Sequence, residues 1–161
     1  QLHSLRAART PALLEIGHVL GPQLRGVMTH AGDSYNCRST DAIRALAERE
    51  RAAVVHCAQR LRAAGLPCPV VSVGSTPTAT CAEHLEGVTE VRAGVYMFFD
   101  LVMAGLGVCA IDDIAVSVLA SVIGHQTQKG WIITDAGWMA LSRDRGTAKQ
   151  AVDQGYGLVC D

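Results

Sequence analysis

The sequence contains little lysine, which occurs only at Lys129 and Lys149, and almost no excess of charge. Its 14 basic and 15 acidic residues leave a net charge of −1 over 161 residues. Binding to nucleic acid needs a basic surface, so this balance argues against such a partner. Long apolar runs are missing as well, because the longest, Ile114 to Gly124, contains serine and is too short to span a bilayer. We therefore expect no membrane partner.

Cysteine pairs of the kind that bind metals are also missing. None of the six cysteines forms a C-x-x-C pair, and no histidine–cysteine group has zinc-finger spacing. A signal peptide is not recognised either, so we expect a cytoplasmic enzyme whose cysteines are buried free thiols. These cysteines are Cys37, Cys57, Cys68, Cys81, Cys109 and Cys160.

The residues that are present suffice for a folded core. Hydrophobic residues make up 49% of the sequence, and the mean hydropathy is +0.21. A length of 161 residues fits one domain or two incomplete ones. The sequence begins with Gln1 and stops at Asp161 without a closing polar tail, so we expect a partial chain that is cut at both ends.

The first part of the sequence alternates between helical and extended patterns, which is typical of an α/β fold with parallel strands. Thr40 is the expected N-cap of the longest helix, because its hydroxyl can accept a free backbone N–H. The expected helices cover Pro11–Leu20, Asp41–Ala64 and a stretch that follows Thr78 and ends near Leu85. The expected strands cover Leu24–His30, Pro69–Val73 and Val88–Phe99.

The longest expected helix has an apolar side and a charged side. Its apolar residues recur at helical spacing and predict the side that packs in the core, whereas its charged residues predict a solvated side. The apolar residues are Ile43, Leu46, Ala47, Val54, Cys57, Ala58 and Leu61. The charged residues are Arg44, Glu48, Arg49, Arg51, Arg60 and Arg62.

The pattern changes in the last third of the chain. Apolar residues predict extended runs at Ile114–Ile123 and Trp131–Leu141, joined by a polar connection at Gly124–Gly130. No helix is expected in this part. We therefore expect an α/β domain over residues 1–104 and a mostly β domain over residues 105–161.

A run of small polar residues follows the expected strand Pro69–Val73. In the run from Gly74 to Thr78, glycine allows an anion to approach closely, while hydroxyls and the start of a helix supply donors. No lysine follows as in a P-loop, and no G-x-G-x-x-G is present, so a phosphate carried by a cofactor fits better than a nucleoside triphosphate. A polar loop that only caps a helix is an equal alternative.

Two further strand ends carry side chains that suit a ligand. His30 ends the expected strand Leu24–His30, at the edge of a parallel sheet where ligands bind. Tyr96 lies in the extended run that begins at Val88, and its phenol could donate to a phosphate oxygen. A purely structural role is the alternative for both side chains.

The three strand-end sites, in this order, resemble the pyridoxal-phosphate enzymes of the D-threonine aldolase and D-serine dehydratase group, which have the alanine-racemase-like fold (fold type III). The matching runs are Leu24–Gly32, Gly74–Thr78, Glu90–Asp100 and Asp135–Ser142. The resemblance implies the C-terminal part of a TIM-like (β/α)8 barrel, followed by the start of a β-rich domain. It also implies a divalent metal in the full-length enzyme and a homodimer.

The resemblance further implies which residues contact the cofactor, pyridoxal 5'-phosphate. His30 would lie against the pyridine ring, and Tyr35 would point into the site. The residues implied at the phosphate are Gly74, Ser75, Thr76, Gly94 and Tyr96.

Two groups that the family uses have no match in this sequence. Family members bind the cofactor through a lysine Schiff base early in the barrel, and neither Lys129 nor Lys149 corresponds to it. They also bind a metal through a histidine with a nearby cysteine or aspartate, but Cys160 and Asp161 have no histidine beside them. Arg6 only partly matches a ring-contacting arginine, because the glycine expected two residues later is absent. The catalytic residues are therefore unassigned, and no metal ligand is assigned.

The function implied by the resemblance is that of a pyridoxal-phosphate-dependent lyase. Such an enzyme, an aldolase or a dehydratase, would act on a D-3-hydroxy amino acid such as D-threonine or D-serine. An amino-acid racemase of the same fold and a non-catalytic cofactor-binding or structural remnant are the alternatives.

Overall fold

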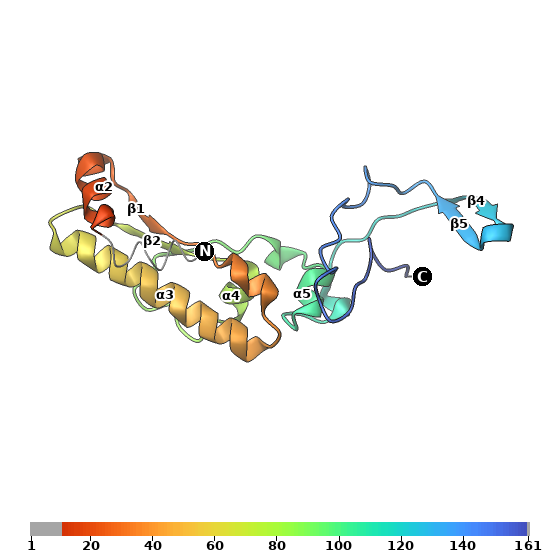
Figure 1. The fold of residues 1–161 in the computed structure, drawn as a ribbon, viewed down its shortest axis with the longest axis horizontal. Helices are drawn as coiled ribbons and strands as arrows, with labels where there is room; N and C mark the ends of the chain where they lie inside the picture. The colour runs from red at the N-terminus through yellow and green to blue at the C-terminus, as the bar shows by residue number, and fades with distance from the viewer. Residues whose placement is uncertain (1–10, 161) are drawn as a thin grey trace. The chain divides into compact units, whose positions relative to one another are not determined.

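The computed structural model describes residues 11–160 and divides the chain into two compact units, Gln1–Tyr96 and Met97–Asp161 (Figure 1). The partial match at Arg6 and the residue Asp161 lie outside the described residues. Within residues 11–160, no helix combines the length and the apolar character that crossing a bilayer requires.

The first unit is built on a three-stranded parallel sheet. Its strands β1 (Gly26–Met28), β2 (Val70–Val73) and β3 (Glu90–Val91) are neighbours in their order along the chain. Sequential order is typical of a (β/α)8 barrel, whereas a doubly wound sheet reverses its order part-way. The α/β prediction is confirmed. The strands are shorter than predicted, and β3 gives way to a 3₁₀ turn at Val95–Met97 instead of continuing to Phe99.

The long helix α3 (Thr40–Ala63) begins one residue earlier than predicted, and its N-cap is Ser39. The Ser39 backbone is extended, and its hydroxyl accepts the Ala42 N–H at 3.2 Å. The prediction that Thr40 caps this helix is therefore wrong, because Thr40 already lies in the first turn.

The shorter helices lie between the strands in the order of the chain. Helix α2 (Ala12–Leu20) precedes β1, and a 3₁₀ helix (Gly32–Asn36) follows it. Helix α4 (Thr76–Cys81) starts directly after β2 and ends well before Leu85, so its predicted position was too late in the chain. Ser75 is its N-cap, and the position of this cap sets the start of the helix.

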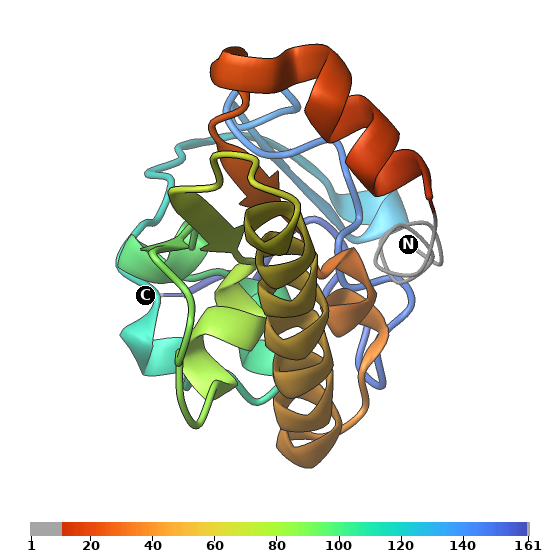
Figure 2. The same cartoon turned by 90° about the vertical axis from the view of Figure 1, so that its left-hand side faces the viewer.

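Helix α3 packs along one face of the sheet (Figure 2). Most of the predicted apolar positions of α3 are buried, although Leu46 is only half-buried. The structure differs from the expected helix faces at three further residues: Glu50 is buried among the apolar residues, and Arg51 and Arg60 are half-buried rather than solvated. The core cluster of the unit consists of Leu24, Val54, Ala58, Leu61, Cys68, Val71 and Val73.

The second unit contains a short helix and a β-hairpin. Helix α5 (Leu101–Gly105) was not predicted; its N-cap Asp100 accepts the Met103 N–H at 2.8 Å. The hairpin pairs β4 (Val122–Gln126) with β5 (Trp131–Thr134) in antiparallel fashion. Strand β4 thus lies partly in the predicted polar connection, and the predicted extended runs are shorter in the structure.

The six cysteines are free thiols, as predicted, but only Cys57 and Cys68 are buried. Burial raises the pKa of both of these thiols. Cys160 is exposed, and the other three are half-buried, so the expectation of uniformly buried thiols is wrong.

Candidate active site

The loop that follows β2 is buried and tightly built. Gly74 has φ +150°, and a Cβ at this position would lie 2.4 Å from the Arg92 carbonyl oxygen. Only glycine fits this backbone at this distance. Ser75 then caps α4, since its hydroxyl accepts the Thr78 N–H at 3.4 Å. The loop therefore caps a helix, as the structural alternative expected.

All three hydroxyls of the Gly74–Thr78 loop have protein partners. Ser75 Oγ lies 3.0 Å from Ser34 Oγ and 2.9 Å from Thr78 Oγ1. Thr76 Oγ1 accepts the Val95 N–H at 3.0 Å. These contacts attach two other segments to the loop, the 3₁₀ helix that carries Ser34 and the turn that begins at Val95.

The remaining predicted site residues, apart from His30, lie on or next to these attached segments. Tyr35 follows Ser34 and is partly exposed, while Gly94 and Tyr96 flank Val95, and Tyr96 is 50% exposed. Space around Gly94 is open, because a Cβ there would meet no atom within 4 Å. His30 is exposed and follows Thr29, whose N–H donates to the Ser72 carbonyl at 3.0 Å. The structure therefore brings the segments of all the predicted residues to the buried loop at the carboxyl ends of the strands.

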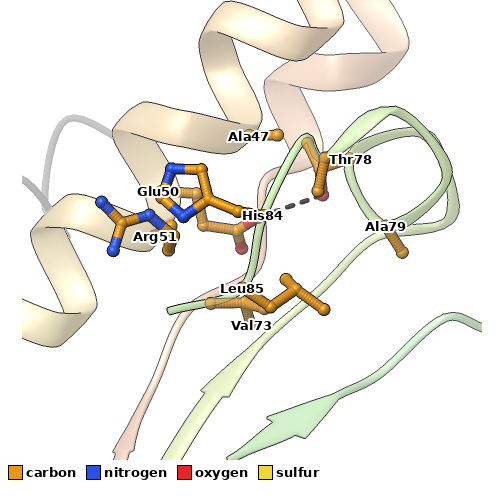
Figure 3. Close-up of a pocket in the computed structure, with 9 residues that line it drawn as sticks. Ala47, Glu50, Arg51, Val73, Thr78, Ala79, His84 and Leu85 are labelled. Carbon is orange, nitrogen blue, oxygen red and sulfur yellow. Dashed lines mark hydrogen bonds between the residues drawn. The ribbon is translucent and has the colours of Figure 1, made fainter. Parts of the chain in front are cut away.

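Glu50 is a site residue that the sequence did not single out. Its carboxylate accepts hydrogen bonds from Thr29 Oγ1 and from the Gly74 N–H. It also accepts one from Thr78 Oγ1, which Figure 3 shows. The one available signal was its position, since Glu50 stands at apolar spacing between Ala47 and Val54 on α3.

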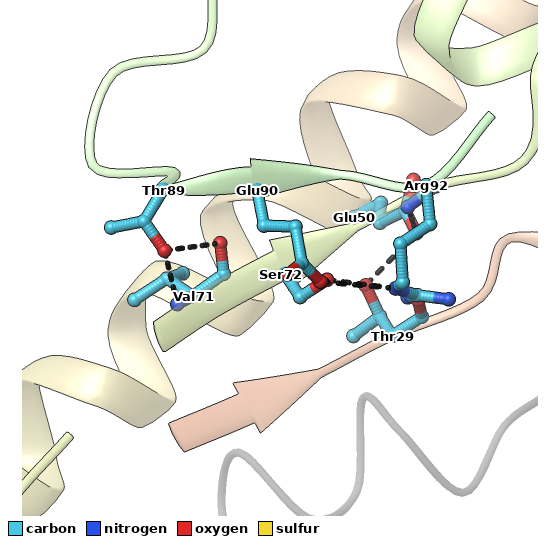
Figure 4. A network of polar contacts seen from close by, with 8 residues as sticks. Thr29, Glu50, Val71, Ser72, Thr89, Glu90 and Arg92 are labelled. Carbon is cyan, nitrogen blue, oxygen red and sulfur yellow. Dashed lines mark hydrogen bonds and ion pairs between the residues drawn. The ribbon is translucent and has the colours of Figure 1, made fainter. Parts of the chain in front are cut away.

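Arg92, whose polar contacts are drawn in Figure 4, is the second residue without a predicted role. Its guanidinium donates to Ser72 Oγ at 2.7 Å and to the Thr29 carbonyl oxygen. Ser72 alternates with Val71 and Val73, which belong to the core cluster, so Ser72 faces the opposite side of the sheet. Arg92 thereby links β3 to the end of β1 on that side.

A small pocket lies behind the loop, between α3, the end of β2 and the segment after α4 (Figure 3). At its rim, His84 Nε2 lies 3.3 Å from Glu48 Oε2, and Arg51 holds the pKa of the Glu48 carboxyl below its usual value through a hydrogen bond. The pocket is lined by Ala47, Glu50, Arg51, Val73, Thr78, Ala79, Ala82, His84 and Leu85. Among residues 11–160, no three histidine, cysteine, aspartate or glutamate side chains are grouped as a metal site would require.

A parallel sheet in sequential strand order, with ligand-binding residue types at the carboxyl ends of its strands, is the arrangement found in part of a (β/α)8 barrel. The chain belongs to the family of the alanine racemase N-terminal domain, whose family model matches residues 6–102. A second family model, for a serine dehydratase domain, matches residues 115–161. The resemblance predicted from the sequence is confirmed.

Several characterised proteins are similar to this chain. D-threo-3-hydroxyaspartate dehydratase from Delftia sp. (strain HT23) is 68% identical over 155 residues, which cover 94% of this chain and 41% of that protein. The structure of that enzyme matches with a TM-score of 0.89. D-serine dehydratase from Dictyostelium discoideum is 34% identical, and the match covers 77% of this chain and 32% of that protein.

A more distant structural match is D-threonine aldolase from Filomicrobium marinum. It has a TM-score of 0.64 and 25% sequence identity, and the match covers 85% of this chain and 38% of that one. The chain thus spans about two fifths of the length of the first of these relatives, the Delftia enzyme.

Proposed function

We propose that the chain is part of a pyridoxal-phosphate-dependent dehydratase that acts on a D-3-hydroxy amino acid. The observation that carries this proposal is the 68% identity to D-threo-3-hydroxyaspartate dehydratase over 94% of the chain. D-Serine is the second candidate substrate, because the 34% identical relative is a D-serine dehydratase. The reaction would remove the Cα proton and the Cβ hydroxyl as water, and hydrolysis would then release ammonia and a 2-oxo acid.

The side chains and backbone of the first unit fit the phosphate end of the cofactor. Buried Ser75 and Thr76 begin a helix after a glycine turn, and Gly94 leaves open space close by. The Gly74 N–H already donates to Glu50, so Gly74 would shape the loop while the Ser75 and Thr76 N–H groups bind phosphate oxygens. The exposed phenol of Tyr96 would donate to the same phosphate.

Two residues would contact the rest of the cofactor and the substrate. His30 would lie against the ring and fix its orientation, and Tyr35 would line the entrance. When bound, the cofactor supplies the electron sink that weakens bonds at the substrate Cα. The lysine that holds the cofactor has no counterpart here, because Lys129 and Lys149 both lie in the second unit.

The proposal also covers the metal, the oligomeric state, the cellular location and the domain boundary of the complete protein. We propose a divalent metal whose ligands lie outside residues 11–160, and a homodimer. A variant of a D-threo-3-hydroxyaspartate dehydratase that is 68% identical to this chain has been solved in a metal-free form, which supports a metal in that relative. The free cysteines support a location in the cytoplasm, where thiols are kept reduced. The family matches at 6–102 and 115–161 support a domain division near residue 105.

The test is an assay of the complete, purified enzyme with D-threo-3-hydroxyaspartate, D-serine and D-threonine. Formation of oxaloacetate and ammonia from the first substrate, or of pyruvate and ammonia from the second, is the expected result. Glycine and acetaldehyde from D-threonine would identify an aldolase instead, the reaction named by the structural neighbour. Interconversion of enantiomers without a 2-oxo acid would identify a racemase.

A further inference from the structure

The buried carboxylate of Glu50 occupies an unusual place on α3. It stands in the row of residues that pack against the sheet, between Ala47 and Val54, and it is only 8% exposed. Placing a carboxylate in such a row is costly unless its oxygens accept hydrogen bonds. None of the ion pairs among residues 11–160 includes Glu50, so its polar oxygens depend on hydrogen bonds in this buried row.

The hydrogen bonds of Glu50 join the ends of two strands and a helix. Oε1 accepts from Thr29 Oγ1 at 2.9 Å, just beyond β1, and from the Gly74 N–H at 3.1 Å, just beyond β2. Oε2 accepts from Thr78 Oγ1 at 3.0 Å, in α4 (Figure 3). One side chain on the outer helix thereby connects the three elements that meet behind the Gly74–Thr78 loop.

The contacts continue from Glu50 to the side chains proposed at the cofactor. Thr78 Oγ1 lies 2.9 Å from Ser75 Oγ, and Ser75 Oγ lies 3.0 Å from Ser34 Oγ, next to Tyr35. Thr29 is the residue before His30. A change at Glu50 would therefore reach both the phosphate loop and the residues at the ring through directly bonded groups.

We infer that Glu50 is a positioning residue that holds the Gly74–Thr78 loop in place against the end of β1. It acts through the loop and touches no reacting atom. The inference rests on the proposed function, because it concerns the phosphate of the proposed cofactor. Loss of Glu50 would free the Gly74 N–H and the Thr78 hydroxyl from their shared acceptor, and the loop would lose the geometry that binds phosphate.

The test compares two ligands in the complete enzyme after removal of its cofactor: pyridoxal 5'-phosphate, and pyridoxal, which lacks the phosphate. In Glu50→Ala we expect the affinity for pyridoxal phosphate to fall by about tenfold or more, and that for pyridoxal by less than about threefold. Hydrogen exchange of the cofactor-free protein should also become faster at residues 74–78. A general loss of stability would lower both affinities alike and would overturn the inference.

Val54→Ala is the matched control. It lies on the same buried side of α3 and belongs to the core cluster. It should destabilise the protein but leave the ratio of the two affinities unchanged. An equal fall of that ratio in Val54→Ala would also overturn the inference.

Thr78→Val keeps the inference testable if Glu50→Ala does not fold. Valine preserves the shape of threonine and removes only the hydroxyl that donates to Oε2. The ratio should fall in the same direction but by less, and an unchanged ratio would contradict the positioning role. If the wild-type enzyme bound no pyridoxal phosphate, the proposed function would fail; normal binding in the wild type and in every variant would refute only the role of Glu50.

Discussion

The two compact units of the chain differ in how much of their apolar surface is buried. Of the buried hydrophobic residues among residues 11–160, all except Met103 and Leu106 lie in the first unit. The first unit encloses a core between α3 and the sheet, whereas every residue of strand β5 in the second unit is exposed. Trp131 and Ile132 are among these exposed apolar side chains.

The two units therefore differ in whether their own contacts can stabilise them. The first unit buries its own apolar stripe, so its fold follows from interactions among its own helices and strands. The hairpin of the second unit presents large apolar side chains to solvent, and an isolated two-stranded hairpin is marginally stable in water. Large apolar side chains exposed next to one another are typical of a region that packs against other protein.

The largest expected effect comes from emptying the core of the first unit. Leu61 is 1% exposed and belongs to the core cluster, so Leu61→Ala should lower the free energy of unfolding by about 2–4 kcal/mol. In the second unit Ile133 is 37% exposed, and Ile133→Ala should cost less than about 1 kcal/mol. Urea denaturation measures both. A large loss in Ile133→Ala would mean that the hairpin is buried in the complete protein.

The same comparison explains what the sequence could predict. Helix α3 was predicted to within one residue at each end, because 24 residues of helical periodicity leave little ambiguity. The hairpin was predicted as two extended runs with displaced ends, because short strands without a buried face lack a clear alternation.

The sequence could predict which segments form the candidate site, but not which side chains contact one another there. Glycine and hydroxyl residues after a buried strand marked Gly74–Thr76 as either an anion site or a helix cap, and the local pattern alone could not decide between the two. The role of Glu50 could not be predicted in this way, because its partners Thr29 and Gly74 lie 21 and 24 residues away in the chain. Which distant groups a buried carboxylate meets is decided by tertiary packing.

The next prediction compares two glycines with positive φ, Gly74 in the first unit and Gly130 in the second. Gly74→Ala combines a φ of +150° with a Cβ only 2.4 Å from the Arg92 carbonyl oxygen, so the backbone itself must move. We expect a loss of more than about 2 kcal/mol. Gly130 has φ +65° and open space, and Gly130→Ala should cost about 1 kcal/mol from backbone strain alone. Thermal unfolding of both variants checks the order, and equal losses would contradict the steric account of Gly74.

Helix caps give a smaller effect in both units. Ser39→Ala removes the acceptor of the Ala42 N–H and should cost about 1 kcal/mol, and Asp100→Ala should cost a similar amount at α5. Thr40→Ala is the control for Ser39 and should change stability by less than about 0.5 kcal/mol. Denaturation midpoints of the three variants decide the matter. A larger loss in Thr40→Ala than in Ser39→Ala would restore Thr40 as the cap.

The smallest effect is the dependence of stability on pH, which depends on one exposed carboxyl in each unit. A hydrogen bond from Arg51 lowers the pKa of Glu48 from its ordinary 4.5, and the Gly155 N–H lowers the pKa of Asp153 from 3.8. Because both pKa values are lowered in the folded protein, each contribution to stability is fully present above the ordinary pKa. Each contribution is lost as the pH falls through the lowered pKa.

Replacing either carboxyl by its amide should remove this dependence. Glu48→Gln and Asp153→Asn should each unfold at slightly lower urea concentration than the wild type near neutral pH, and the difference should disappear in acid. Added salt should reduce both differences, since the groups are exposed and their charges are screened. A difference that persisted unchanged in acid would show that the amide disturbs packing and that the charge contributes nothing. If only Glu48→Gln had an effect, the second unit would lack even this local stabilisation, and the contrast between the units would become sharper.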